Sequence, residues 1–95
     1  MLNFTWDPDK AIANAKKHGV TFPEASTAYG DPLSVTVSDP DHSEGEARFL
    51  LVGLTSEHRL VVVAHLEAQD SIHIISARLA TRAERRDYEE EDTSR

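Results

Sequence analysis

The chain has 95 residues, of which 39% are hydrophobic, no cysteine, and a formal net charge of −7. This length supports one hydrophobic core, and the composition is typical of a globular chain and not of a disordered one. Disulfides, thiolate chemistry and cysteine-ligated zinc are excluded, and the negative charge argues against a general nucleic-acid coat.

The N-terminal segment predicts a short strand and a helix. Residues 3–6 alternate polar and aromatic side chains, which is typical of a strand. Asp7 is a good helix cap, and Pro8 fits the first helical position. Gly19 follows a run of three cations and is a favourable stop. We therefore predict a first helix from Pro8 to His18.

The middle of the chain predicts a second, short helix and then a series of strands. Thr21 and Glu24 have the spacing of a capping box, so a helix is expected from there to about Tyr29. Runs rich in valine and leucine, separated by turn residues, predict four further strands. The expected strands are Leu33–Val37, Ala47–Thr55, Arg59–Glu67 and Ile72–Ala77. A polar loop, Asp39–Gly45, is expected between the first two.

The C-terminal segment predicts a last helix. Thr81 and Glu84 form a second capping box, which opens a helix running to about Glu90, and residues 89–95 are expected to be a frayed acidic tail. No linker or repeat divides the chain, so residues 1–95 are one domain. Short turns require antiparallel neighbours. The predicted fold class is α+β, an antiparallel meander with two N-terminal helices and one C-terminal helix.

The cellular location is expected to be the cytoplasm. The start of the chain lacks the basic and apolar segments of a signal peptide. The longest apolar run, Leu60–Ala64, is far too short to cross a membrane.

Strand parity divides the side chains of the Arg59–Glu67 strand between two faces. One face, with Leu60 and the alternate apolar residues that follow it, is assigned to the core. The other face carries Arg59, His65 and Glu67. It is either a polar site or the exposed face of an edge strand, and from parity alone the exposed edge is the favoured interpretation. His73 and Arg78 differ in parity, so they can share a site only if a bulge intervenes.

Polar residues suited to phosphate chemistry are present, whereas metal motifs are not. No two of the five histidines have a metal-binding spacing, and the chain has neither a phosphate-binding glycine loop nor a nucleophile elbow. Glu46 with His42 could hold a metal, but a solvated loop is favoured. Arginines could instead clamp a phosphate ester while a histidine or glutamate moves protons. The basic residues Arg78–Arg86 form a local patch suited to one phosphate or one acidic partner.

Motifs at both ends of the chain, with shorter ones between them, resemble one family in order and without a large gap. At the N-terminus these are Phe4-Thr5-Trp6-Asp7-Pro8-Asp9-Lys10-Ala11, Asn14 and Lys17-His18-Gly19-Val20-Thr21-Phe22. At the C-terminus they are Ile74-Ile75-Ser76-Ala77-Arg78, Ala80-Thr81, Glu84-Arg85-Arg86 and Tyr88-Glu89. Between them lie Glu24-Ala25, Asp31-Pro32, Glu46 with Arg48, and Arg59-Leu60. Together they resemble the signature of BrnT toxins.

The resemblance implies a RelE-like fold and a bacterial toxin of a type II toxin–antitoxin pair. Such a toxin cleaves RNA without a metal or other cofactor and inhibits translation and growth. A BrnA-like ribbon-helix-helix antitoxin would neutralise it, in a hetero-oligomer or beside a toxin homodimer, and would alone contact operator DNA. The alternative is a catalytically weak module that binds the antitoxin and regulates the operon. Two departures favour it: an acidic body, and His73 where the family pattern leads us to expect arginine.

The resemblance also implies roles for individual residues. Catalytic roles fall to five of them: phosphate clamping to Arg59, Arg78 and Arg82, proton transfer to His18, and the part of the base to Glu46. RNA-binding roles fall to Lys17, Arg48 and Arg85. A structural alternative is open for Arg78, which could instead pair with Glu84 or Glu46.

Overall fold

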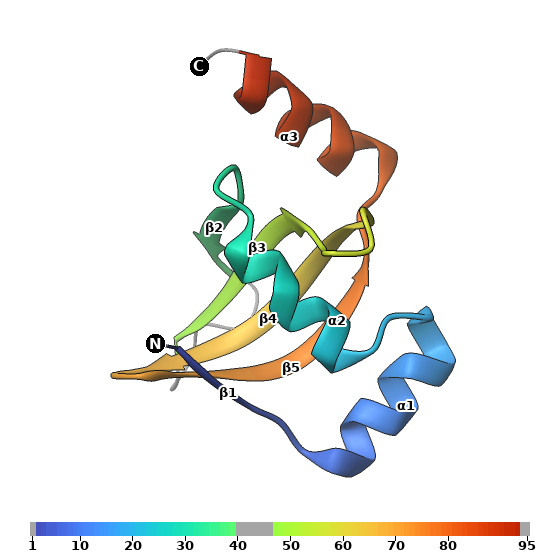
Figure 1. Cartoon of the computed structure of the whole chain (residues 1–95), viewed down its shortest axis with the longest axis vertical. Coiled ribbons are helices and arrows are strands. Elements are labelled where there is room, and N and C mark those ends of the chain that lie inside the picture. Colours follow the sequence, from blue (N-terminus) through green and yellow to red (C-terminus); the bar gives the residue numbers. More distant parts are fainter. Residues whose placement is uncertain (1, 40–46, 94–95) are drawn as a thin grey trace.

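The computed structural model describes residues 2–39 and 47–93 (Figure 1). The polar loop predicted after Asp39 and the candidate base Glu46 therefore lie outside the described residues. In chain order the elements are β1 (Asn3–Thr5), α1 (Pro8–His18), α2 (Phe22–Thr27), the 3₁₀ helix η1 (Ala28–Gly30), β2 (Val35–Ser38), β3 (Arg48–Leu54), β4 (Leu60–Ala68), β5 (Ser71–Leu79) and α3 (Arg82–Thr93).

The strands form one five-stranded sheet in the order β1-β5-β4-β3-β2. Strands β2 to β5 are antiparallel neighbours, which confirms the predicted meander. The first strand departs from the prediction because β1 runs parallel to β5, with Phe4 opposite Ile72. A parallel pair needs a long crossover, and here almost the whole chain lies between the two strands. The sheet is therefore mixed and not purely antiparallel.

The three helices begin at the predicted caps. The Asp7 carboxylate accepts hydrogen bonds from the backbone of Asp9 and Lys10, and Gly19 ends α1 with a left-handed φ of 71°. The α3 capping box is reciprocal: the Glu84 N–H donates to Thr81 Oγ1 (3.1 Å), and the Thr81 N–H donates to Glu84 Oε1 (2.8 Å). The helix continues to Thr93, three residues beyond the predicted end.

The core lies between the sheet and the layer formed by α1, α2 and η1 (Figure 1). β4 is the central strand, so its predicted position at an edge is wrong. The parity assignment of the core is also wrong, because the face that carries Val61, Val63 and His65 packs under the helices. Leu60 and Val62 on the opposite face are buried as well, as expected for a strand with neighbours on both sides.

A bulge in β5 changes which of its side chains share a face. Ala64 pairs with Ser76 and His65 with Ile74, which leaves Ile75 without a partner. Ile74 before the bulge and Ala77 after it therefore both face the core. By strand parity, His73 and Arg78 can share a face only if a bulge lies between them, and this bulge meets that condition.

Helix α3 leaves the end of β5 and reaches β3 on the face away from α1 and α2. Its Tyr88 hydroxyl donates to Asp31 Oδ2 at 2.6 Å, which ties the helix to the segment before β2. Val52 lines a pocket against this helix, whereas the alternate residue Gly53 contacts η1. No helix within residues 2–39 and 47–93 is long and apolar enough to cross a membrane.

Candidate functional site

The amide of Asn14 joins α1 to the edge of β5. Its side chain is buried, and Nδ2 donates to the carbonyls of Ala77 (2.8 Å) and Val20 (3.0 Å). Its Oδ1 accepts from the Ala77 N–H at 3.1 Å. β1 pairs with β5 only as far as His73. Further along β5 no strand of the described residues lies on that side, and the Asn14 amide instead satisfies the backbone groups of Ala77. The C-terminal turn of α1 is thereby fixed beside Ser76.

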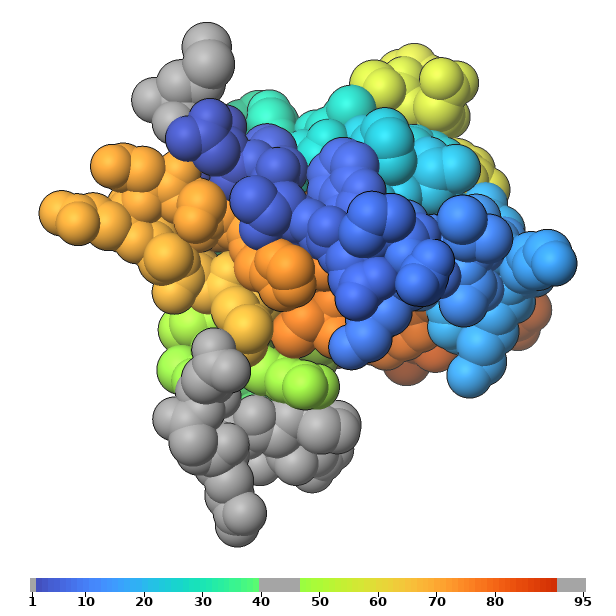
Figure 2. Space-filling view, turned by 90° about the horizontal axis from the view of Figure 1, so that it is seen from below, coloured from blue at the N-terminus to red at the C-terminus, as the bar shows by residue number. Residues whose placement is uncertain are grey.

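A shallow pocket of about 240 Å³ opens between α1 and β5. Figure 2 shows the surface where α1 lies against the strand. Lys17, His18 and Ser76 line this pocket and carry its polar groups together with Lys10 and Asn14. Within the described residues, Lys17 and His18 form no ion pair and no side-chain hydrogen bond. Their cationic and imidazole groups are therefore available to an anion.

Arg59 lies near the same end of α1, held by a carboxylate. Its Nε donates to Glu24 Oε2 and its Nη2 to the Gly19 carbonyl, both at 2.9 Å, and Nη2 also forms an ion pair with Glu24 Oε1. The hydrogen bond from Arg59 lowers the pKa of Glu24, against a smaller opposing effect of burial. The Arg59 side chain is 37% exposed, and Nη1 has no protein partner in the described part of the chain. One end of the guanidinium is therefore available.

Arg78 forms an ion pair with Glu84, which is one of the two structural partners proposed for it from the sequence. Nη1 and Nη2 donate to the two carboxylate oxygens at 2.8 and 3.0 Å. The hydrogen bond from Arg78 contributes most to lowering the pKa of Glu84 to about 2, with a smaller opposing effect of burial. The same carboxylate caps α3 through Thr81, so this ion pair connects β5 to the helix.

The predicted site residues divide into three groups. Lys17 and His18 line the pocket at the end of α1, and Arg59 donates to the carbonyl of Gly19, the residue that follows His18. Arg78 lies on the opposite sheet face with α3, where Arg82 and Arg85 are exposed on the helix. Arg48 begins β3 opposite Leu66, seven positions along β4 from Arg59 and so roughly 20 Å away. The structure does not bring Arg48 to the other arginines, and Glu46 is outside the described residues.

The buried histidine of β4 is a core residue. His65 is 1% exposed, its Nδ1 lies 2.5 Å from the Tyr29 hydroxyl, and its Nε2 lies 3.0 Å from Glu67 Oε2. Burial raises the pKa of Tyr29 well above its usual range. His73, at the other end of β5 from Arg78, lies 2.8 Å from Thr5 Oγ1 through Nδ1. Neither histidine contributes to the pocket beside α1.

Asn14 and Glu24 are the residues whose roles sequence reasoning did not assign. Both stand within the motifs of the resemblance, and Glu24 was explained only as a capping residue. A polar asparagine within the inward-facing side of α1 is the one local signal for the first. Nothing local signals the Arg59 pair, because 35 positions separate its two partners. No group of three or more potential metal-ligating side chains is present in the two described stretches.

Comparison with known proteins finds both a matching family and a similar solved structure. A family described as "Ribonuclease toxin, BrnT, of type II toxin-antitoxin system" matches residues 6–84. The 1.1 Å crystal structure of the Brucella abortus ribonuclease toxin, BrnT, has the same fold, with a TM-score of 0.62 and 19% identity over 86% of this chain and 100% of that one. No curated protein matches. With most of its length matched, the chain belongs to the BrnT family of ribonuclease toxins of type II toxin–antitoxin systems.

Proposed function

We propose that the protein is a metal-independent endoribonuclease of RelE-like fold that acts in the bacterial cytoplasm and inhibits translation and growth. Membership of a type II family implies an antitoxin partner, and we propose a ribbon-helix-helix protein of the BrnA type. The observation that carries the catalytic proposal is the pocket between α1 and β5. Lys17 and His18, neither of them paired within the described chain, line this pocket, and the partly free guanidinium of Arg59 donates to the carbonyl of the next residue, Gly19.

The proposed reaction is attack of a ribose 2′-hydroxyl on the adjacent phosphate. The 2′-O–P bond forms and the P–O5′ bond breaks, which yields a 2′,3′-cyclic phosphate and a 5′-hydroxyl. His18 would transfer a proton, as base toward the 2′-hydroxyl or as acid toward the leaving oxygen. Lys17 and Arg59 Nη1 would stabilise the negative charge of the phosphorane. Glu46 stays in the proposal as an alternative base, on the resemblance alone.

The remaining arginines receive binding roles. Arg82 and Arg85, exposed on α3, would attract the RNA backbone. Arg78 would clamp a phosphate once the phosphate displaces Glu84, because its two terminal nitrogens are engaged by that carboxylate. Arg48, at the far end of β3, would contact a longer RNA only.

A second function, a catalytically weak module that binds the antitoxin and regulates the operon, is favoured by the same ion pairs. Arg59, immediately before β4, and Arg78, on β5, are both assigned to the phosphate, and both are bound to carboxylates. The chain also carries a net charge of −7. Each carboxylate offsets the cation that the transition state would need, which lowers the expected catalytic rate.

Cleavage of RNA by the purified, antitoxin-free protein in the presence of a chelator tests the proposal. We expect 2′,3′-cyclic phosphate ends and a fall in kcat of about 10²-fold in His18→Gln, the usual contribution of one proton-transferring group. Lys17→Ala and Arg59→Ala should also lower kcat/KM. The matched control is Lys16→Ala, since Lys16 is exposed on α1 and does not line the pocket.

The outcomes separate the two functions. Cleavage that requires added metal, or that is reduced by none of the His18, Lys17 and Arg59 variants, contradicts the proposed site. Absence of cleavage together with tight antitoxin binding supports the regulatory module. In cells, expression should arrest growth, and co-expression of the antitoxin should relieve the arrest.

A further inference from the structure

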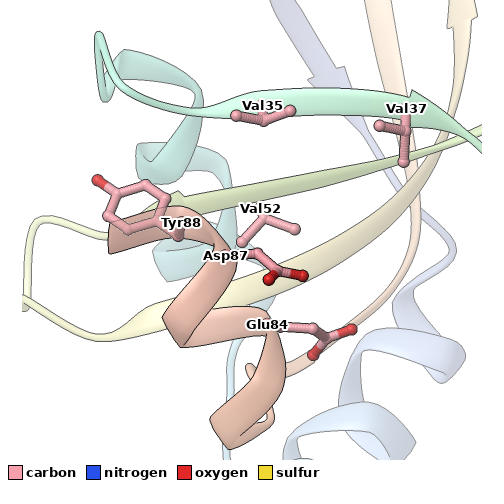
Figure 3. A pocket seen from close by; sticks show the side chains of 6 residues that line it. All are labelled: Val35, Val37, Val52, Glu84, Asp87 and Tyr88. Atoms are coloured by element: carbon pink, nitrogen blue, oxygen red, sulfur yellow. The ribbon is translucent and has the colours of Figure 1, made fainter. Parts of the chain in front are cut away.

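A second pocket, of about 220 Å³, lies between α3 and the strands β2 and β3 (Figure 3). Six residues line it: Val35, Val37, Val52, Glu84, Asp87 and Tyr88. Figure 3 shows the valines on the strand side and the other three side chains on the helix. The pocket is on the sheet face opposite α1, and it shares no lining residue with the proposed catalytic pocket. We refer to it as the α3 groove.

The floor of the α3 groove is apolar and incompletely covered. β2 is an edge strand of the sheet, and its Val37 is 51% exposed. Val35 and Val52 are directly opposite each other across the two strands and are only half-buried. Another chain that covered these three valines would bury more of their apolar surface, which would stabilise the complex.

The helix side of the α3 groove is acidic. Asp87 is exposed and forms no ion pair within the described residues, while the Glu84 carboxylate is bound to Arg78. The arginines of α3 occupy other positions of the helix and do not line the pocket. An apolar floor beside an unpaired carboxylate does not suit RNA, but it suits a peptide segment with apolar and basic side chains.

We propose that the α3 groove is a docking surface for the antitoxin. The fitting segment carries at least two apolar side chains, which contact the valines, next to a lysine or arginine that pairs with Asp87. A second copy of this chain is a poorer occupant, because a two-fold symmetric contact through this face brings equivalent acidic groups together. The inference rests on the proposed function in one respect, namely that an antitoxin neutralises this protein.

Affinity for the antitoxin encoded with the toxin, measured by titration calorimetry on purified proteins, tests the surface. We expect Val37→Asp and Asp87→Lys each to weaken binding by ten-fold or more. The controls are Ile12→Asp and Asp70→Lys, which place the same changes on exposed residues of α1 and of the β4–β5 turn. Both controls should stay within two-fold of the unchanged protein, and thermal unfolding verifies that each variant is folded.

A charge exchange tests the proposed pairing directly. Changing the antitoxin's basic residues to glutamate one at a time should identify one change that restores binding to Asp87→Lys. Antitoxin affinity that is unchanged in both groove variants overturns the proposal, and so does a groove variant that dissociates a homodimer without affecting antitoxin binding. Neither groove variant alters the catalytic pocket, so RNA cleavage by the isolated variants reports on the proposed function separately.

Discussion

At the scale of single residues, two carboxylates determine what Arg59 and Arg78 can do. Glu24 holds Arg59 from the side of α2, and Glu84 holds Arg78 from the side of α3. Both pairs are charge-assisted and engage two guanidinium nitrogens, which fixes the direction of the arginine as well as neutralising it. Arg59 keeps Nη1 free, whereas both terminal nitrogens of Arg78 are engaged. We therefore expect Arg59 to contribute more to phosphate binding.

The ion pair of Glu84 predicts an acid-dependent loss of stability. Its pKa is lowered from 4.5 to about 2 by Arg78 and the Thr81 cap. The ionised carboxylate therefore contributes fully above pH 4.5, and its contribution disappears as the pH falls toward 2. Glu84→Gln keeps an acceptor for the capping box but removes the charge. At pH 7 it should lower the free energy of unfolding by about 1 kcal/mol, as for a partly exposed ion pair.

Urea unfolding at a series of pH values measures this effect. The unchanged protein should lose more stability between pH 5 and pH 2.5 than Glu84→Gln, so the two curves converge in acid. Asp70→Asn is the control, because Asp70 is exposed in a turn and its side chain forms no ion pair in the described structure. Parallel curves for Glu84→Gln and the unchanged protein would show that the Arg78 pair does not stabilise the fold.

At the scale of elements, the contact between η1 and β3 depends on one glycine. A Cβ on Gly53 would lie 3.0 Å from the Ala28 carbonyl oxygen and 3.0 Å from the Ser34 Cβ. Both are tighter than ordinary van der Waals contacts, and the first involves backbone that cannot rotate away. Gly53→Ala should therefore destabilise the protein by about 1–3 kcal/mol, the usual cost of overpacking a core.

Gly30 provides the matched control for this substitution. It ends η1, it has no positive φ, and nothing lies within 4 Å of a Cβ built on it. Gly30→Ala should change the free energy of unfolding by less than about 0.5 kcal/mol. Equal midpoints for both variants in urea would mean that η1 does not pack closely on β3.

The elements that were predicted correctly depend on local signals. Asp7, Thr21 and Thr81 cap their helices through contacts within three residues, and a sequence displays such contacts directly. The parallel β1–β5 pair and the bulge at Ile75 depend on partners far away in the chain. Their positions follow from packing of the whole sheet, which no local pattern encodes.

The candidate site was predictable to a similar extent. Lys17 and His18 are adjacent and end a helix, so their common position needed only the helix boundary. Whether Arg59 joins them depends on the sheet register and on Glu24, which are not visible in the sequence. The sequence also could not reveal that Arg59 and Arg78 project to opposite faces, because that depends on the register of β5 against β4, in which Arg78 is opposite Val62, and the bulge shifts this register.

At the scale of the whole molecule, the net charge of −7 limits how RNA can be bound. The proposed RNA-contacting cations at the end of α1 are Lys17 and Arg59, with Arg82 at the start of α3 on the opposite face of the sheet, and α3 continues into acidic residues. A long RNA would be attracted at the site and repelled beside it, so the number of phosphates bound should be small.

The salt dependence of RNA affinity measures that number. Each phosphate contact on single-stranded RNA contributes a slope of about −0.7 to log K against log salt. Three contacts predict a slope of about −2 for a labelled 2′-O-methyl RNA, which cannot be cleaved through the 2′-hydroxyl, measured by fluorescence anisotropy. Lys17→Ala should make the slope shallower by about 0.7, while Lys16→Ala, outside the pocket, should leave it unchanged. A slope of about −5 or steeper would require an extended basic track that this acidic surface does not offer, and a slope near zero would exclude phosphate recognition at the end of α1.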